Sequence, residues 1–180
     1  MSTYKQSIPQ ADTLMGSMRS MGYSFEAAIA DVIDNSISAN CNVVKLFFPS
    51  EPTDELVVGI LDDGEGMPAD VLFEAMRYGS TDSELERRAN DLGRFGLGMK
   101  SASLSQCRIL TVVSLYADKL SSYSWDFNCI QKRKEWIVKE LSQTEIKSLP
   151  YIDSLLELSH GTLVLWQDFD VLEKSSGGLV

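Results

Sequence analysis

The chain has 180 residues, of which 44% are hydrophobic and 23% charged; these proportions are ordinary for one globular domain with one sizeable core. Its formal net charge of -10 repels phosphate backbones and anionic membranes, so we expect nucleic-acid contact only through regions outside this sequence. No apolar run reaches membrane-spanning length, and the three cysteines form no CxxC pair. Reduced thiols and a cytoplasmic location are therefore expected, rather than a disulfide framework, a zinc site or a membrane anchor.

The first predicted elements are an arm and a helix. Residues 1–21 are polar and irregular, and we expect an arm with a short helix over residues 11–19. Ser24 can cap a second helix that runs to about Ala39. Four of its apolar residues share one stripe at helical spacing, which predicts the buried face: Ile29, Val32, Ile33 and Ile37.

The polar side of this second helix is a candidate for chemistry. Asp31, Asp34, Asn35 and Ser38 fall on the face opposite the apolar stripe. Asp31 and Asn35 are four positions apart, so their side chains are neighbours. A solvated face is the plain interpretation, but a carboxylate beside a carboxamide also suits a water and a hard cation.

The remaining elements alternate irregularly between strands and helices. We expect strands at 42–48, 55–61, 108–115, 121–127, 136–140 and 161–166, and helices at 68–78, 98–105 and 144–156, the last broken by Pro150. Residues 79–95 are polar without a clear period and are expected to form a long functional loop. Strands joined by short turns argue against an all-parallel sheet, so we predict an α/β (α+β) two-layer sandwich with a mixed sheet and helices on one face.

Three further motifs carry glycines or polar groups at element ends. Asp62-Asp63-Gly64-Glu65-Gly66-Met67 directly follows a buried strand, and its glycines allow positive φ and a close approach to backbone. Residues 93–101, Gly-Arg-Phe-Gly-Leu-Gly-Met-Lys-Ser, open a helix, whose free N–H groups attract phosphate. Gly161-Thr162 begins an apolar strand. Each motif alone also fits a plain turn, hinge or strand.

Taken together and in this order, the motifs resemble those of the GHKL superfamily of ATPases, which includes gyrase, a heat-shock chaperone, histidine kinases and MutL. The resemblance runs from about Ser24 to Trp166. The residues of the motifs are most similar to those of the MORC-like branch, including its bacterial members. The resemblance implies the Bergerat fold, in which a mostly antiparallel sheet and its helices hold ATP or ADP with Mg²⁺ beneath a lid, here residues 79–95.

The resemblance also assigns roles to single residues. Asn35 would be the Mg²⁺ ligand, and Asp62 would accept a hydrogen bond from the adenine amino group. The other nucleotide contacts would come from groups beside the base and around the phosphates: Asp34, Gly64, Gly66, Met67 and Thr162 near the base, and Gly93, Phe95, Gly96, Leu97, Gly98, Met99 and Lys100 in the lid and phosphate loop.

Asp31 stands where the family usually has a glutamate as general base, and Ser38 stands where many members have an aspartate. Asp31 is therefore the candidate catalytic residue. Because aspartate is one methylene shorter than glutamate, its carboxylate reaches less far toward the attacking water, and slow or absent hydrolysis is an open outcome. Many members also complete the γ-phosphate site with a lysine from a following domain, which this sequence does not include.

Three functions follow from the resemblance. The first is an ATPase switch that forms a nucleotide-dependent homodimer through the arm, residues 1–21, and the lid, and that acts on a downstream domain of the same protein. The domain itself would span residues 22–170, with a linker at 171–180. The second is a nucleotide-gated scaffold without hydrolysis. The third is a histidine kinase, which would need a phosphoacceptor histidine before the domain, whereas the only histidine, His160, is expected in a surface loop.

Overall fold

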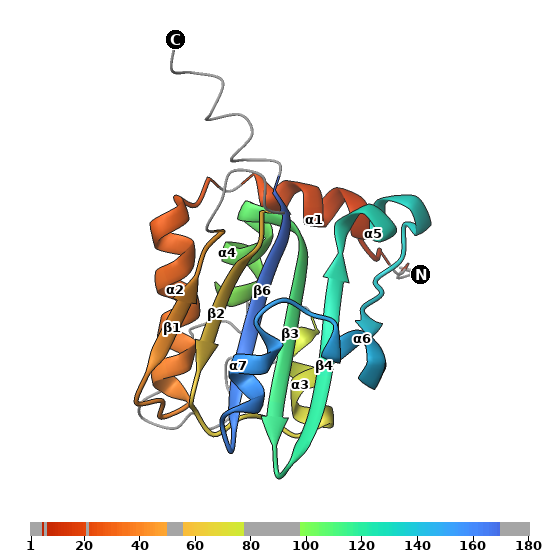
Figure 1. Cartoon of the computed structure of the whole chain (residues 1–180). Coiled ribbons are helices and arrows are strands. Elements are labelled where there is room, and N and C mark those ends of the chain that lie inside the picture. The colour runs from red at the N-terminus through yellow and green to blue at the C-terminus, as the bar shows by residue number, and fades with distance from the viewer. Residues whose placement is uncertain (1–4, 6, 21, 50–55, 78–97, 170–180) are drawn as a thin grey trace.

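The computed structural model describes residues 5, 7–20, 22–49, 56–77 and 98–169 (Figure 1). Helices and strands alternate irregularly along the chain, as the sequence predicts. In chain order the elements are α1 (Ala11–Arg19), α2 (Phe25–Ser38), β1 (Val44–Phe47), β2 (Val58–Asp62), α3 (Ala69–Met76), α4 (Gly98–Gln106), β3 (Cys107–Tyr116), β4 (Lys119–Asp126), α5 (Phe127–Arg133), β5 (Lys139–Glu140), α6 (Gln143–Lys147), α7 (Ile152–Leu156) and β6 (Gly161–Phe169).

Within the described ranges the strands form a six-stranded sheet in the order β1-β2-β6-β3-β4-β5, and each of these pairings is antiparallel. The last strand in the chain, β6, is therefore inserted between β2 and β3, where its first six residues are buried. The predicted α/β sandwich is confirmed, and the antiparallel sheet with its helices agrees with the Bergerat fold.

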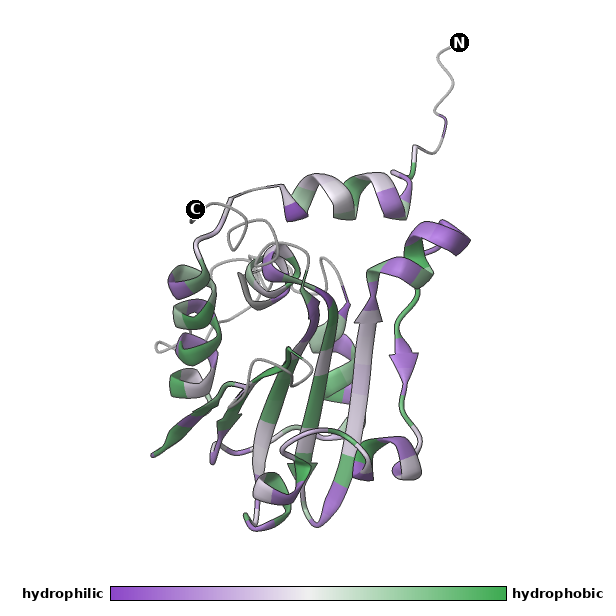
Figure 2. Ribbon diagram, turned by 45° about the horizontal axis from the view of Figure 1, so that its top comes forward, coloured by the Kyte–Doolittle hydropathy of each residue, from purple (hydrophilic) through white to green (hydrophobic). Residues whose placement is uncertain are grey.

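The two faces of the sheet carry different layers. On one face, α1, α2, α3 and α4 contribute to the larger core, together with residues such as Ile60, Val112 and Trp166 from the strands. On the other face, alternate strand residues such as Leu61 and Leu163 pack with α6 and α7. Figure 2 shows hydrophobic residues along much of the sheet and on the helices that cover it. The long helices thus lie on one face, as expected, and the short α6 and α7 add a smaller layer on the other.

Helix α2 begins where the sequence predicts, but its buried face is rotated. The Ser24 side chain caps it by accepting a hydrogen bond from the Ala27 amide at 3.2 Å. The buried line is Ala28, Val32 and Ser36, whereas Ile37 is 53% exposed. The prediction that Ile37 is a core residue is therefore wrong, because the helix turns Ser36, not Ile37, toward the end of β2.

The segment after β4 differs most from the prediction. The Asp126 side chain accepts a hydrogen bond from the Cys129 amide at 3.1 Å and starts helix α5, which the sequence analysis missed. The basic residues Lys132 and Arg133 occupy its last turn, and Lys134 ends it with a φ of 58°. These cations complement the negative end of the helix dipole.

Two neighbouring predictions have mixed outcomes. The strand expected over 136–140 is only Lys139–Glu140. The helix expected over 144–156 is divided into α6 and α7, and Pro150 lies between them, so the predicted break is confirmed.

Helix α1 packs on its own chain. Its Ala11 and Met15 side chains are 1% and 0% exposed and belong to the larger core. At its end, the Arg19 guanidinium donates to the Leu104 carbonyl at 2.6 Å and to the Cys107 carbonyl, and it lies 4.9 Å from the centre of the Phe127 ring. The predicted helix over residues 11–19 is confirmed, and α4, α5 and the first residue of β3 supply contacts to it.

Candidate functional site

Three polar side chains form a row across the end of the sheet. Asp62 on β2 is paired with Thr162 on β6, and Thr162 with Ser114 on β3. Since side chains alternate along a strand, all three lie on the same face as the next apolar row, which is buried in the larger core: Ile60, Val164 and Val112. The row therefore lies on the face covered by the long helices, at the point where the core ends.

Asp62 is the most constrained member of this row. Its side chain is buried, with the residue 5% exposed. The Ser36 hydroxyl donates to Oδ2 at 2.8 Å, and the Gly64 amide donates to Oδ1 at 2.9 Å. Burial raises the pKa of Asp62, while donors from Ser36, Gly64 and the Thr162 backbone oppose that rise. A buried carboxylate in this position can accept one more hydrogen bond, such as that of an amino group on a flat heterocycle.

The turn after Asp62 approaches other backbone closely at both glycines. Gly66 has a φ of +68°, and a Cβ there would lie 2.3 Å from the Leu115 carbonyl oxygen. A Cβ on Gly64 would lie 2.9 Å from the Ala39 carbonyl oxygen. The protein's own packing therefore requires glycine at both positions. Their close approach to a ligand remains a prediction.

Hydrogen bonds hold the same turn between α2 and β3. The Glu65 amide donates to the Ala39 carbonyl at 3.0 Å, and Asn40 Nδ2 donates to the Glu65 side chain at 2.8 Å. The Met67 amide donates to the buried Ser114 hydroxyl at 2.7 Å. The Met67 side chain packs against the larger core, so the turn that begins with Asp62 has a fixed position.

The predicted catalytic and metal residues lie together on α2. Asn35 Nδ2 donates to the Asp31 backbone carbonyl at 2.6 Å, so the Asn35 amide oxygen is the atom that can ligate a cation. Asp31 is half-buried, and burial, followed by the nearby charge of Asp34, raises the pKa of its carboxyl group. Asp34 itself is exposed. The described contacts bring Ser36, rather than Asp34, to Asp62.

The phosphate-loop residues are described only in part. Gly93, Phe95, Gly96 and Leu97 lie outside the described residues, as does the lid at 79–95. Gly98 and Met99 are in the first turn of α4. The roles of all of these residues remain predictions.

The Lys100 side chain faces α3. It is buried at 2% exposure, and Nζ donates to the carbonyls of Ala75 at 2.8 Å and Arg77 at 2.5 Å. Burial lowers the pKa of Lys100 to about 8. The side chain thus holds the end of α3, and any phosphate contact of Lys100 would come from its backbone N–H.

Sequence reasoning missed three residues of this site. Ser36 and Ser114 hold Asp62 and Met67 as described, and His160 Nδ1 lies 2.6 Å from the Gly64 carbonyl oxygen. A lone serine within the apolar run of β3 was a signal for Ser114. His160 is exposed and precedes a strand, as expected, but nothing in the sequence indicates its partner.

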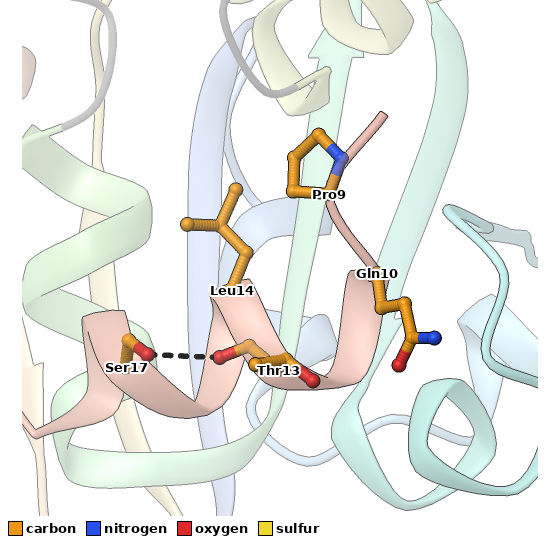
Figure 3. Close-up of a pocket in the computed structure, with 5 residues that line it drawn as sticks. All are labelled: Pro9, Gln10, Thr13, Leu14 and Ser17. Carbon is orange, nitrogen blue, oxygen red and sulfur yellow. Dashed lines mark hydrogen bonds between the residues drawn. The ribbon is translucent and has the colours of Figure 1, made fainter. Parts of the chain in front are cut away.

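A surface hollow of about 330 Å³ lies elsewhere, on α1 (Figure 3). Its lining residues are Pro9, Gln10, Thr13, Leu14 and Ser17. Within the lining, the Ser17 hydroxyl donates to the Thr13 carbonyl at 3.0 Å. The hollow shares no residue with the candidate site, which is defined by its hydrogen bonds and glycines.

The described part of the chain contains no group of three or more His, Cys, Asp or Glu side chains that could hold a metal ion. Mg²⁺ in proteins commonly takes waters and substrate oxygens as further ligands beside one or two side chains, and the proposed site at Asn35 is of that kind. Across the same described ranges, no helix has the length and apolar character needed to cross a bilayer.

One comparison with known proteins agrees with this geometry. The model of the family described as histidine kinase-, DNA gyrase B- and HSP90-like ATPase matches residues 23–162. The match begins just before α2 and ends at Thr162, so it includes all the predicted site residues. No curated protein matches the chain.

Proposed function

Because this chain belongs to the histidine kinase-, DNA gyrase B- and HSP90-like ATPases, it is an ATP-binding domain, and we propose that it hydrolyses ATP with Mg²⁺ and switches conformation and dimerisation with the bound nucleotide. The family match supports nucleotide binding in general. The proposals on hydrolysis and metal rest on individual residues of the site, and the proposal on switching rests on α1 and the lid.

The observation that carries the proposal is the buried Asp62 carboxylate. It lies at the end of β2, beside Thr162, with both oxygens already oriented by protein donors. Adenine offers an amino donor next to a ring nitrogen, and a fixed carboxylate beside a hydroxyl is complementary to that edge. The residues present therefore fit an adenine nucleotide.

The catalytic part of the proposal concerns α2. A Mg²⁺ ion at the Asn35 amide oxygen would neutralise phosphate charge, which is the chemistry the metal supplies. Asp31, one helical turn earlier, would orient a water or take its proton. Burial, followed by the nearby charge of Asp34, raises the pKa of the Asp31 carboxyl group, which makes it a stronger base than an ordinary aspartate.

The switching part of the proposal concerns α1 and the lid. In the structure α1 is held by α4 and α5. Because α4 directly follows the predicted phosphate loop, a shift of that loop on nucleotide binding would be transmitted to α1 through α4. We propose a homodimer formed through the arm and lid, with a downstream domain as the effector. We also propose a cytoplasmic location. The residue patterns at 28–39 and 93–101 are the basis on which we propose membership of the MORC-like branch.

The test compares Asp31→Asn with the parent chain and with Asp153→Asn, a matched change at an exposed position of α7. ATP affinity is measured by titration calorimetry, and phosphate release by a coupled assay. We expect all three proteins to bind ATP, and Asp31→Asn alone to lose turnover by roughly a hundredfold or more, as for the loss of a general base. Equal phosphate release by Asp31→Asn and parent would contradict the role of Asp31.

A non-hydrolysing scaffold is the second candidate, because aspartate replaces the family's usual glutamate at position 31. The same experiment separates the two candidates. Binding of ATP by the parent with no phosphate release would favour the scaffold.

A further inference from the structure

The pairing of β2 with β6 brings two loops together at one end of the sheet. Asp62 is opposite Thr162 in this antiparallel pair, so the residues after Asp62 and those before Thr162 leave the sheet side by side. Gly161 allows the approach, since a Cβ there would lie 2.3 Å from the Asp62 carbonyl oxygen. His160 is consequently placed beside the turn that follows Asp62.

The contact between His160 and Gly64 has a defined chemistry. His160 Nδ1 lies 2.6 Å from the Gly64 carbonyl oxygen. A carbonyl can only accept, so Nδ1 carries the hydrogen, in either the neutral Nδ1–H tautomer or the imidazolium.

Both polar backbone groups of Gly64 form hydrogen bonds, one to Asp62 and one to His160. Its N–H donates to Asp62 Oδ1 at 2.9 Å, and its carbonyl accepts from His160. The hydrogen bond from His160 thus fixes the residue that orients the buried carboxylate. From the opposite side, the Glu65 amide is bonded to the Ala39 carbonyl at the end of α2, so the turn is held between α2 and His160.

We propose that His160 is a positioning residue of the adenine subsite: through Gly64 it holds the Asp62 carboxylate in the orientation that accepts the base. This inference rests on the proposed nucleotide binding and adds a residue to it. His160 does not itself have to touch the nucleotide. Its loss is expected to loosen the turn and weaken binding while leaving the fold intact, since the side chain is exposed.

The test uses four variants of the whole chain. His160→Ala removes the donor. His160→Asn places a carboxamide nitrogen as many bonds from Cα as Nδ1 and can restore the hydrogen bond, whereas His160→Gln places its nitrogen one bond farther away. Ser159→Ala, at the exposed neighbouring position, is the matched control.

ADP affinity is measured by titration calorimetry, with circular dichroism to show that each variant is folded. We expect His160→Ala and His160→Gln to bind roughly three- to tenfold more weakly, the range for one lost hydrogen bond. His160→Asn and Ser159→Ala are expected to stay within about twofold of the parent. Rescue by asparagine alone would separate positioning from a general effect of changing the loop. Parent-like binding by His160→Ala would overturn the proposal and leave nucleotide binding intact.

Amide hydrogen exchange without nucleotide provides the independent readout. We expect the Gly64 and Glu65 amides to exchange faster in His160→Ala than in the parent, with the amides of β3 unchanged. If the folded parent bound no ADP, the proposed function would fail on its own. In that case, unchanged exchange in the turn would also overturn the role of His160 in holding it, and faster exchange would support that role.

Discussion

Gly66→Ala tests the geometry of the turn after β2. Gly66 has a φ of +68°, where an alanine costs about 1–2 kcal/mol. The added Cβ would also lie 2.3 Å from the Leu115 carbonyl oxygen, against the 3.0 Å below which Cβ contacts essentially do not occur. Backbone must therefore move by several tenths of an ångström, for which overpacking adds about 1–3 kcal/mol. The expected loss of unfolding free energy is about 2–5 kcal/mol.

The assay is urea unfolding followed by circular dichroism, with Gly16→Ala as the matched control. Gly16 is inside helix α1, and a Cβ there would meet the Phe127 ring at an ordinary 3.9 Å. That substitution should stabilise the chain by about 0.5–1 kcal/mol through helix propensity. The two glycine-to-alanine changes thus have opposite expected signs. If the unfolding free energy of Gly66→Ala differed from that of the parent by no more than about 0.5 kcal/mol, the close approach of the turn to β3 would be refuted.

Two further predictions concern buried polar contacts. Ser36→Ala removes the hydroxyl that donates to Asp62 and should cost about 1.5–3 kcal/mol in urea unfolding, as for a hydrogen bond to a charged group; a cost no larger than that of Ser38→Ala would show that the contact is weak. Lys100→Met tests the pKa of about 8, lowered by burial from 10.5. Between these two pH values the folded chain holds fewer protons than the unfolded chain, so the parent should gain stability relative to Lys100→Met as pH rises from 8 toward 10.5. Parallel pH profiles for the two proteins would contradict the lowered pKa.

Local signals in the sequence predicted much of the fold. Ser24 is a recognisable cap, and Pro150 breaks a helix wherever it falls within one. Helix α5 was missed because its only strong start signal is Asp126, which also fits the end of a strand. Ile37 was misplaced because helical spacing identifies an apolar stripe but not the exact line that faces the sheet, which tertiary packing decides.

The candidate site divides in the same way. Asp62, Gly66 and Thr162 were predicted as site residues because the motifs that contain them, taken together and in order, resemble those of the family. Ser114 and His160 take their importance from long-range register, which places them beside residues far away in the chain. A single sequence holds no record of such pairings, so their partners became known only from the fold.

The most direct test of the central claim is titration calorimetry of the whole chain with ADP and with a non-hydrolysable ATP analogue, with and without Mg²⁺. The account predicts that the parent binds both nucleotides, that Mg²⁺ strengthens binding of the ATP analogue, and that Asp62→Asn abolishes binding while remaining folded. No binding of either nucleotide by the folded parent, or equal binding by Asp62→Asn, would contradict the assignment of the adenine site.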